Sequence, residues 1–241
     1  MRSRTWLGIL LLLLPAPARA DWIAAAFLGH AATRPSTVVL TLPERQTAID
    51  IEGVQYRGES FRSPQYYGYR VMWVPDALPW LGIEGEYIHA KVFAETQRTV
   101  HMRGTLDGAP IDTNVPMSSV AQRLAMSHGL NFLLANVAVR HDMGPVDPRG
   151  RPRLALVVRA GAGPTLPHAE STVNGRNVDQ YESGGVGAQV GGSIEALAWK
   201  GLGVVADYKF TWATPEIDIP GGTARIPSRT HHVVFGIACR F

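Results

Sequence analysis

The feature that most constrains this chain is a two-residue alternation of side-chain character along several stretches. In 201–212, the even positions from Leu202 to Trp212 are apolar or aromatic, whereas Asp207 and Lys209 lie on the odd positions. A period of two indicates β-strands rather than helices. The stretches run about nine to twelve residues, longer than the usual strand of about five or six, and near the length with which a tilted strand crosses a bilayer. The stretches are 22–29, 65–73, 80–88, 128–140, 153–163, 185–195, 201–212 and 230–241.

Two of these stretches are weaker than the others. The stretch 22–29 is apolar on both faces, and 128–140 carries Asn131 and Asn136 on opposite faces, so its orientation stays open. In most of the remainder, one face is apolar and the other combines small residues with charges of both signs. The charges on that second face are Arg70, Glu84, Glu86, Arg159, Glu195, Asp207, Lys209 and Arg240.

Charges of both signs on a strand face point to a narrow interior. Isolated charges buried there are costly, so we expect them to pair. An eight-stranded barrel has an interior just wide enough for side chains to fill. We therefore interpret these residues as an ion-paired lumen, with Glu195 and Arg240 as the expected partners of Lys209 and Asp207.

The connections between the stretches alternate in length, as those of an up-and-down barrel do. They run long, short, long, medium, long, short and long, so the four long ones fall on one side. They are 30–64, 74–79, 91–127, 141–152, 164–184, 196–200 and 213–229. Aromatic residues on the other side, at Trp22, Trp73, Trp80, Trp199 and Phe241, suit an interfacial girdle. The predicted fold is all-β: an eight-stranded antiparallel up-and-down transmembrane β-barrel with long external loops.

The first twenty residues have the three-part pattern of a secretory signal peptide. Arg2 and Arg4 precede an apolar run from Trp6 to Leu14, and small residues follow up to Ala20. We expect cleavage there, which makes 1–20 a signal peptide and 21–241 the barrel domain. The chain has 23 Lys and Arg against 20 Asp and Glu. The expected cleavage removes three arginines and no acid, so the mature chain is neutral and no nucleic-acid partner is indicated.

The last stretch, "THHVVFGIACRF", is apolar on one face up to Phe241. We expect this strand to face lipid and to close the barrel against the first strand. A terminal aromatic after alternating apolar residues also resembles the signal that barrel assembly machinery recognises. We thus expect export through the periplasm, a monomer in the outer membrane of a Gram-negative bacterium, and outer-membrane lipids and lipopolysaccharide as partners.

Six motifs carry a resemblance to a known family. "GESFRSPQYYGYR" (58–70), "EYIHAKVF" (86–93), "SHGLNFL" (127–133), "LPHAES" (166–171), "DYKFTW" (207–212) and "THHVVFGIACRF" (230–241) occur in order. The chain resembles the outer-membrane β-barrel family that includes lipid A oxidases. The resemblance implies an activity that oxidises the proximal glucosamine of lipid A to 2-aminogluconate with oxygen. It implies no particular set of catalytic residues.

The histidines are the residues most suited to that chemistry. On the predicted topology, most of them fall near the external rim, and imidazole suits iron, copper or zinc. The candidate metal ligands are His89, His128, His168, His231 and His232, for an unidentified redox metal such as iron or copper. The candidate catalytic residues are His89, Lys91, His128 and Asn131, with Tyr66 and Glu170 nearby. The competing interpretation is that rim histidines are polar interface residues that avoid the hydrocarbon layer.

Three function classes remain open. The first is an outer-leaflet lipid A-modifying enzyme, and the second is a non-enzymatic barrel whose loops contact lipopolysaccharide, host or phage. The third, a channel, is disfavoured because a lumen filled with paired charges leaves little path for water. A serine nucleophile is also disfavoured, because Ser127 and His128 are adjacent in a strand and should point to opposite faces.

Overall fold

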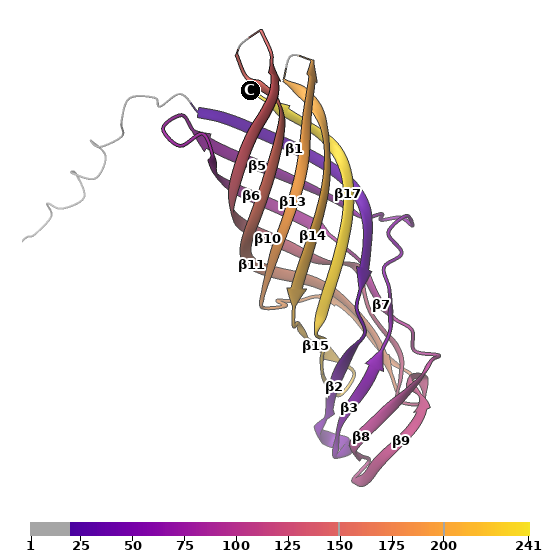
Figure 1. Cartoon of the computed structure of the whole chain (residues 1–241). Coiled ribbons are helices and arrows are strands. Elements are labelled where there is room, and N and C mark those ends of the chain that lie inside the picture. The colour runs from indigo at the N-terminus through magenta and orange to yellow at the C-terminus, as the bar shows by residue number, and fades with distance from the viewer. Residues whose placement is uncertain (1–19, 149, 200) are drawn as a thin grey trace, which may run out of the picture.

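The computed structural model describes residues 20–148, 150–199 and 201–241 and consists almost entirely of antiparallel β-strands (Figure 1). In this part of the chain the only helical turns are the two short 3₁₀ segments Pro43–Arg45 and Met117–Ser119. Over these same residues, no helix has the length and apolar character needed to cross a membrane. The all-β prediction is therefore confirmed, while the predicted signal peptide lies outside the described residues except for Ala20.

One sheet closes on itself. Its strands pair antiparallel in succession, and β17 pairs back onto β1 from Ile23↔Arg240 to Thr33↔Thr230. We call these eight strands the ring (Figure 1). They are β1 (Ala20–Thr33), β5 (Tyr67–Pro75), β6 (Leu81–His89), β10 (Ala121–Val146), β11 (Pro152–Val173), β13 (Val186–Trp199), β14 (Leu202–Ala213) and β17 (Ser228–Arg240). Each predicted stretch overlaps one strand of the ring.

The predicted long connections are largely β-structure rather than irregular loops. Three short strands, β4 (Tyr56–Arg57), β7 (Val92–Ala94) and β12 (Arg176–Tyr181), extend the ring sheet. Six others form a second sheet, with the order β15-β16-β2-β3-β8-β9. They are β2 (Ser36–Leu42), β3 (Thr47–Val54), β8 (Thr99–Leu106), β9 (Ala109–Pro116), β15 (Glu216–Ile219) and β16 (Gly222–Arg225). Strands β10 and β11 also run well past their predicted bounds, to 26 and 22 residues.

The two ends of the ring differ, as the sequence predicts. At one end of the ring, which we call the terminal end, Ala20 and Phe241 lie with the strand ends that flank the short connections (Figure 1): Pro75 and Leu81, Val146 and Pro152, and Trp199 and Leu202. The second sheet lies at the opposite, distal end. Trp22, Trp73, Trp80 and Phe241 are all exposed near the terminal end, whereas the side chain of Trp199 is not among those described.

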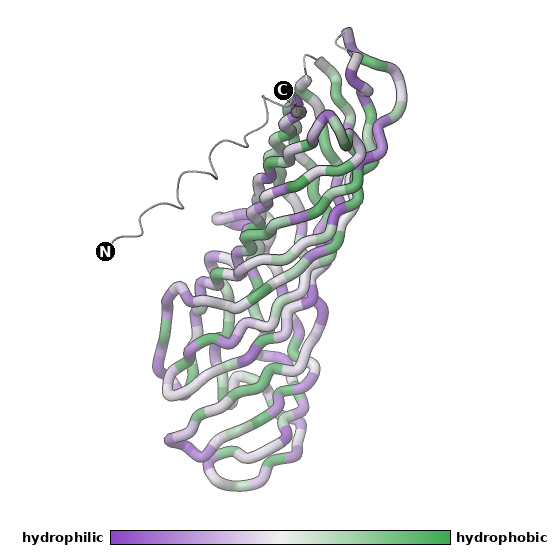
Figure 2. Tube along the Cα trace, turned by 90° about the vertical axis from the view of Figure 1, so that its left-hand side faces the viewer, coloured by the Kyte–Doolittle hydropathy of each residue, from purple (hydrophilic) through white to green (hydrophobic). Residues whose placement is uncertain are grey.

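The outer wall of the ring is apolar. Hydrophobic and hydrophilic positions alternate along the strands in Figure 2. The apolar set faces outward, and Val158, Val204 and Phe235 are 65%, 60% and 64% exposed. The exposed apolar side chains are thus gathered on one continuous wall, and an exposed apolar patch of this kind is characteristic of an interaction surface.

The lumen holds a network of ion pairs. Arg70 lies 2.5 Å from Asp207, Arg159 lies 3.0 Å from Glu84, and Arg140 lies 2.5 Å from Glu195. Lys209 contacts Glu86 and lies 3.3 Å from Asp207. These side chains are almost completely buried, which confirms the prediction of an ion-paired interior.

The predicted partners within this network were wrong. Lys209 pairs with Glu86 of β6, which lies across the lumen, rather than with Glu195. Arg240 pairs with Asp21 and Asp142 at the terminal end and does not reach Asp207. A lumen as narrow as this one brings together strands that are not neighbours, and the sequence does not show which strands face one another.

Toward the distal end, apolar side chains fill the interior in place of the ion pairs. One cluster continues from Phe27 of β1 into the second sheet, where Leu40, Ile49 and Met102 are buried. The same cluster includes Phe132 of β10. The ring and the second sheet therefore share one packed interior.

Candidate functional site

A strip of polar side chains lies on the outward face of β6, β10 and β11, near the distal end of the ring. Asn131 shares its strand face with Leu133, Val137 and Val139, which are 43%, 51% and 50% exposed. Asn136 lies on the opposite face and donates to Glu84 and Glu86 in the lumen. The structure thus settles the orientation that the sequence leaves open.

A β-bulge in β10 builds the centre of this strip. Met126 pairs with Ala169 and Leu130 pairs with Pro167, so three residues of β10 oppose one residue of β11. Gly129 within the bulge has φ +94°, a conformation that favours glycine. A Cβ at this position would lie 2.6 Å from Nδ1 of His89. Bulges re-aim side chains in this way.

The bulge brings Ser127 and His128 together, contrary to the sequence prediction. Oγ of Ser127 lies 3.3 Å from Nδ1 of His128 and 3.3 Å from Nδ1 of His168 on β11. The two Nδ1 atoms are also 3.3 Å apart. Strict alternation would have separated Ser127 from His128, but the inserted residues break it.

An acid completes this group. Nε2 of His168 lies 3.3 Å from Oδ1 of Asp179 on β12, and the ring of Tyr181 packs edge-on against His168 at 4.4 Å. We call Ser127, His128, His168 and Asp179 the rim cluster. Ser127 is 8% exposed, whereas the Asp179 side chain is 63% exposed. Glu170, two residues from His168 on β11, pairs with Arg123 at 2.6 Å.

A second group lies beside the rim cluster, toward the apolar wall. The Tyr87 hydroxyl donates to Oδ1 of Asn131 at 2.9 Å, and Nδ1 of His89 lies 2.9 Å from the same oxygen. Tyr67 stacks on the His89 ring at 4.7 Å. Asn131 in turn donates to the backbone carbonyl of His128 at 3.2 Å. Asn131 therefore connects the predicted residue His89 to the rim cluster.

The remaining predicted residues lie elsewhere. Lys91 donates to the backbone carbonyl of Arg62 at 2.9 Å, and burial lowers the pKa of its ammonium group. His231 faces outward on β17, where it lies 2.6 Å from the Tyr208 hydroxyl. His232 is buried in the lumen, with Nε2 2.8 Å from Oγ1 of Thr211, and Tyr66 packs against it.

Of the five predicted metal ligands, the structure brings together His128 and His168. Across the described residues, no group of three or more His, Cys, Asp or Glu side chains is arranged to hold one metal ion. His231 and His232 lie on opposite sides of the ring wall because they are neighbours in a regular strand.

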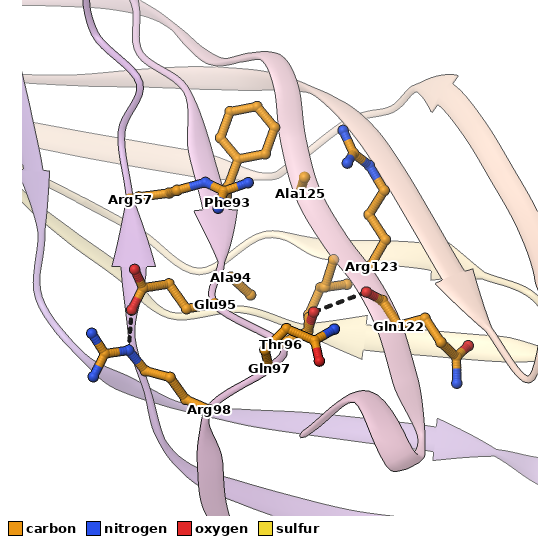
Figure 3. Close-up of a pocket in the computed structure, with 11 residues that line it drawn as sticks. Arg57, Phe93, Ala94, Glu95, Thr96, Gln97, Arg98, Gln122, Arg123 and Ala125 are labelled. Atoms are coloured by element: carbon orange, nitrogen blue, oxygen red, sulfur yellow. Dashed lines mark hydrogen bonds and ion pairs between the residues drawn. The ribbon is translucent and has the colours of Figure 1, made fainter. Parts of the chain in front are cut away.

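Beyond the rim cluster, β10 borders a basic pocket of about 370 Å³ (Figure 3). The guanidinium groups of Arg57 and Arg123 lie 5.6 and 5.7 Å from the centre of the Phe93 ring, and the Lys91 ammonium lies 5.8 Å from it. Arg98 also lines the pocket and pairs with Glu95. Arg123 belongs both to this pocket and, through Glu170, to the surroundings of Ser127.

On the opposite side of the strip is an apolar groove of about 510 Å³. It runs over the outer wall between Tyr69, Gly85, Tyr87, Leu133 and Ala135. A Cβ at Gly85 would meet nothing within 4 Å, so the groove is open there. Tyr87 lines the groove and bonds Asn131, while Arg123 lines the basic pocket and pairs with Glu170. The polar strip therefore lies between the groove and the pocket.

Comparison with known proteins finds similar chains among the solved structures. No protein-family model matches the chain, and no curated protein matches it by sequence. Neisserial surface protein A is similar with a TM-score of 0.46 and 10% identity over 92% of this chain and 99% of that chain. The N-terminal β-barrel domain of OprF from Pseudomonas aeruginosa has a TM-score of 0.43 and 9% identity over 92% and 97%. Ail, the attachment invasion locus protein of Yersinia pestis, has a TM-score of 0.41 and 9% identity over 92% and 99%.

Proposed function

We propose that this chain is an eight-stranded outer-membrane β-barrel that modifies a lipid of the outer leaflet with its outward-facing polar strip. One observation carries the proposal: the strip lies on the same face of the ring as the exposed apolar side chains of Leu133, Val137 and Val139, and not in the lumen. A residue on this face meets the head group or the upper acyl chain of a lipid.

The outer wall and the lumen support the membrane assignment. Transmembrane barrels alternate apolar side chains outward with polar side chains inward. A contiguous apolar wall of this extent on a water-soluble protein would be an aggregation hazard. In this proposal the terminal end faces the periplasm, the distal end faces outward, and residues 1–20 are an export signal removed by cleavage. Phe241 and the β17 strand are the proposed contact with the assembly machinery.

Lipid A is the proposed lipid, because the sequence motifs resemble a family that includes lipid A oxidases. Oxidation by oxygen would require a redox centre. Nδ1 of His128 and Nδ1 of His168 are 3.3 Å apart, the separation of two ligands around one tetrahedral metal at about 2.0–2.1 Å. The donor set is incomplete, however, since catalytic sites of this kind use about three protein ligands. His128 and His168 therefore do not complete a metal site by themselves.

Mass spectrometry of lipid A tests the proposal. Lipid A should be compared between cells with and without the protein, grown in air and without oxygen. A mass change that requires the protein should disappear in His128→Ala. It should persist in His231→Ala, which removes an outward-facing histidine remote from the strip. Oxidation would appear as an oxygen-dependent gain of one oxygen atom.

A surface-interaction barrel without enzymatic activity is the second candidate. The observation that favours it is the second sheet, whose strand β9 exposes most of its side chains at the distal end. Identical lipid A with and without the protein would refute lipid A modification and favour this candidate.

A further inference from the structure

We propose that Ser127 is the nucleophile of an ester hydrolase, with His168 as its general base and Asp179 as the residue that positions the base. The substrate class is an acyl ester of an anionic lipid. This inference rests on the proposed function only in placing that lipid in the outer leaflet.

The contacts follow the order that nucleophilic catalysis needs. Oγ of Ser127 lies 3.3 Å from Nδ1 of His168, and Nε2 of the same ring lies 3.3 Å from Oδ1 of Asp179. Nucleophile–base contacts are often this long before substrate binds. Since a neutral imidazole carries one proton, donation from Nε2 to Asp179 leaves Nδ1 free to accept the Ser127 proton.

His128 fits the same arrangement. If its Nδ1 carries the proton, it donates to Oγ of Ser127 at 3.3 Å, while the Ser127 hydroxyl donates to His168. One set of protons thus satisfies the contacts of Ser127 with His128 and with His168, and the contact of His168 with Asp179. His128 is then a donor beside the reacting centre, and when Oγ of Ser127 attacks, this N–H can turn to the carbonyl oxygen of the ester, where negative charge develops during acyl transfer.

Glu170, two residues from His168 on β11, is a second candidate base near Ser127. Arg123 occupies both carboxylate oxygens of Glu170, at 2.6 and 2.8 Å. A carboxylate engaged in this bidentate pair is a weaker base. His168 is therefore the group that takes the proton.

The reaction balances with these residues and water. Oγ of Ser127 attacks the ester carbonyl carbon, and its proton passes to Nδ1 of His168. The ester C–O bond breaks, and the alcohol oxygen leaves with the proton from His168. Water then attacks the acyl group on Ser127, gives one proton to His168, and releases a fatty acid. His168 returns that proton to Oγ of Ser127.

The surroundings define the substrate class. The apolar groove beside Tyr87 and Gly85 is open on the lipid-facing wall and accommodates an acyl chain. The basic pocket on the other side, with Arg57, Arg98 and Arg123, suits an anionic head group. An ester between chain and head group would then lie against Ser127.

The test uses the full-length protein in detergent micelles. A fluorophosphonate probe should label Ser127, and peptide mass spectrometry should locate the label on that residue. The label should vanish in Ser127→Ala. Ser119→Ala is the matched control, because Ser119 is an exposed serine at the distal end that bonds only its local backbone at Pro116. Heat-modifiable migration on gels verifies folding of each variant.

Hydrolysis of a medium-chain p-nitrophenyl ester gives the second readout. His168→Ala should lower kcat by about 10²–10⁴-fold, the usual contribution of a general base. Asp179→Asn should lower kcat with little change in KM, because Asp179 orients the base without touching the substrate. A purely structural role for Asp179 would instead alter folding or both constants together.

The outcomes separate this inference from the proposed function. Folded protein that is not labelled at Ser127, or a folded Ser127→Ala variant with undiminished ester hydrolysis, would overturn the inference. If lipid A is nevertheless modified in cells, the proposed function stands without it. Labelling and hydrolysis together with unchanged lipid A would support the hydrolase and refute lipid A as its substrate.

Discussion

Replacing Lys209 with methionine should strongly destabilise the ring. Lys209 is completely buried, contacts Glu86 across the lumen, and lies 4.2 Å from the centre of the Phe27 ring. Asp207 would keep Arg70 at 2.5 Å and Arg159 at 3.2 Å. Glu86 would retain hydrogen bonds but lose the cation that it contacts.

The expected loss of unfolding free energy follows from the buried Glu86 carboxylate, which no longer contacts a cation. Breaking a buried pair by removing one partner costs about 3–5 kcal/mol. With a urea dependence of about 2 kcal/mol per molar, this lowers the unfolding midpoint by about 2 M. Adding Glu86→Gln to Lys209→Met should restore most of the loss, because the remaining group is neutral and still accepts hydrogen bonds from Gln189.

Urea titration in lipid vesicles, followed by tryptophan fluorescence and by gel migration without heating, measures these changes. Arg45→Met is the control, because Arg45 forms an exposed pair with Asp107 at the distal end. Exposed pairs contribute little to stability, so this variant should lower the midpoint far less than Lys209→Met. An unchanged midpoint in Lys209→Met would refute the reasoning. So would a double variant as unstable as the sum of the two single variants.

Three further predictions concern other parts of the chain. Gly129→Ala should displace His89 and destabilise the protein by about 1–3 kcal/mol, since its Cβ would lie 2.6 Å from Nδ1 of that ring; an unaltered urea midpoint would contradict this. Deleting Phe241, which is exposed at the terminal end, should reduce outer-membrane levels and heat-modifiable protein in cells, whereas normal levels would argue against an assembly role. The hydrogen bond from Arg45 holds the pKa of Asp107 below its ordinary 3.8, so this contact stabilises the folded state above that pH and is lost as pH falls through the lowered value. NMR titration of the carboxyl carbon should show the midpoint rising in Arg45→Met, and equal midpoints would refute the assignment.

The period-two pattern predicts most of the ring because side-chain alternation is a property of each strand alone. The parity of Asp207 and Lys209 was enough to place both in the lumen. Their partners could not be predicted in the same way. Glu86 meets Lys209 across the lumen, and such a contact depends on the tilt and registry of the whole ring rather than on one strand.

The rim cluster was missed for a different reason. Adjacent residues such as Ser127 and His128 point apart only while a strand is regular, and the bulge breaks that rule. Gly129 was the available signal, since a glycine inside a strand often marks a bulge. Conversely, the parity of His231 and His232 already indicated that these two could not share a ligand site.

The long connections contained overlooked strands as well. The segment 36–42, STVVLTL, is rich in the β-branched residues that favour strands. At seven residues it is shorter than the membrane-length stretches, so the pattern that predicts the ring places it in a loop. Its pairing with β3 and β16 depends on segments far apart in the sequence, which local patterns do not reveal.

The seam between β1 and β17 has a consequence for how the molecule forms. It joins Ile23 to Arg240 and Thr33 to Thr230, so nearly the whole chain separates the paired residues. Bringing such distant segments together carries a large entropic cost before any contact repays it. Until the last strand arrives, the first strand has one unpaired edge, and unpaired edges promote aggregation. The nascent chain must therefore be kept apart from its own copies until this pairing forms, and its maturation should be slow and limited by this final step.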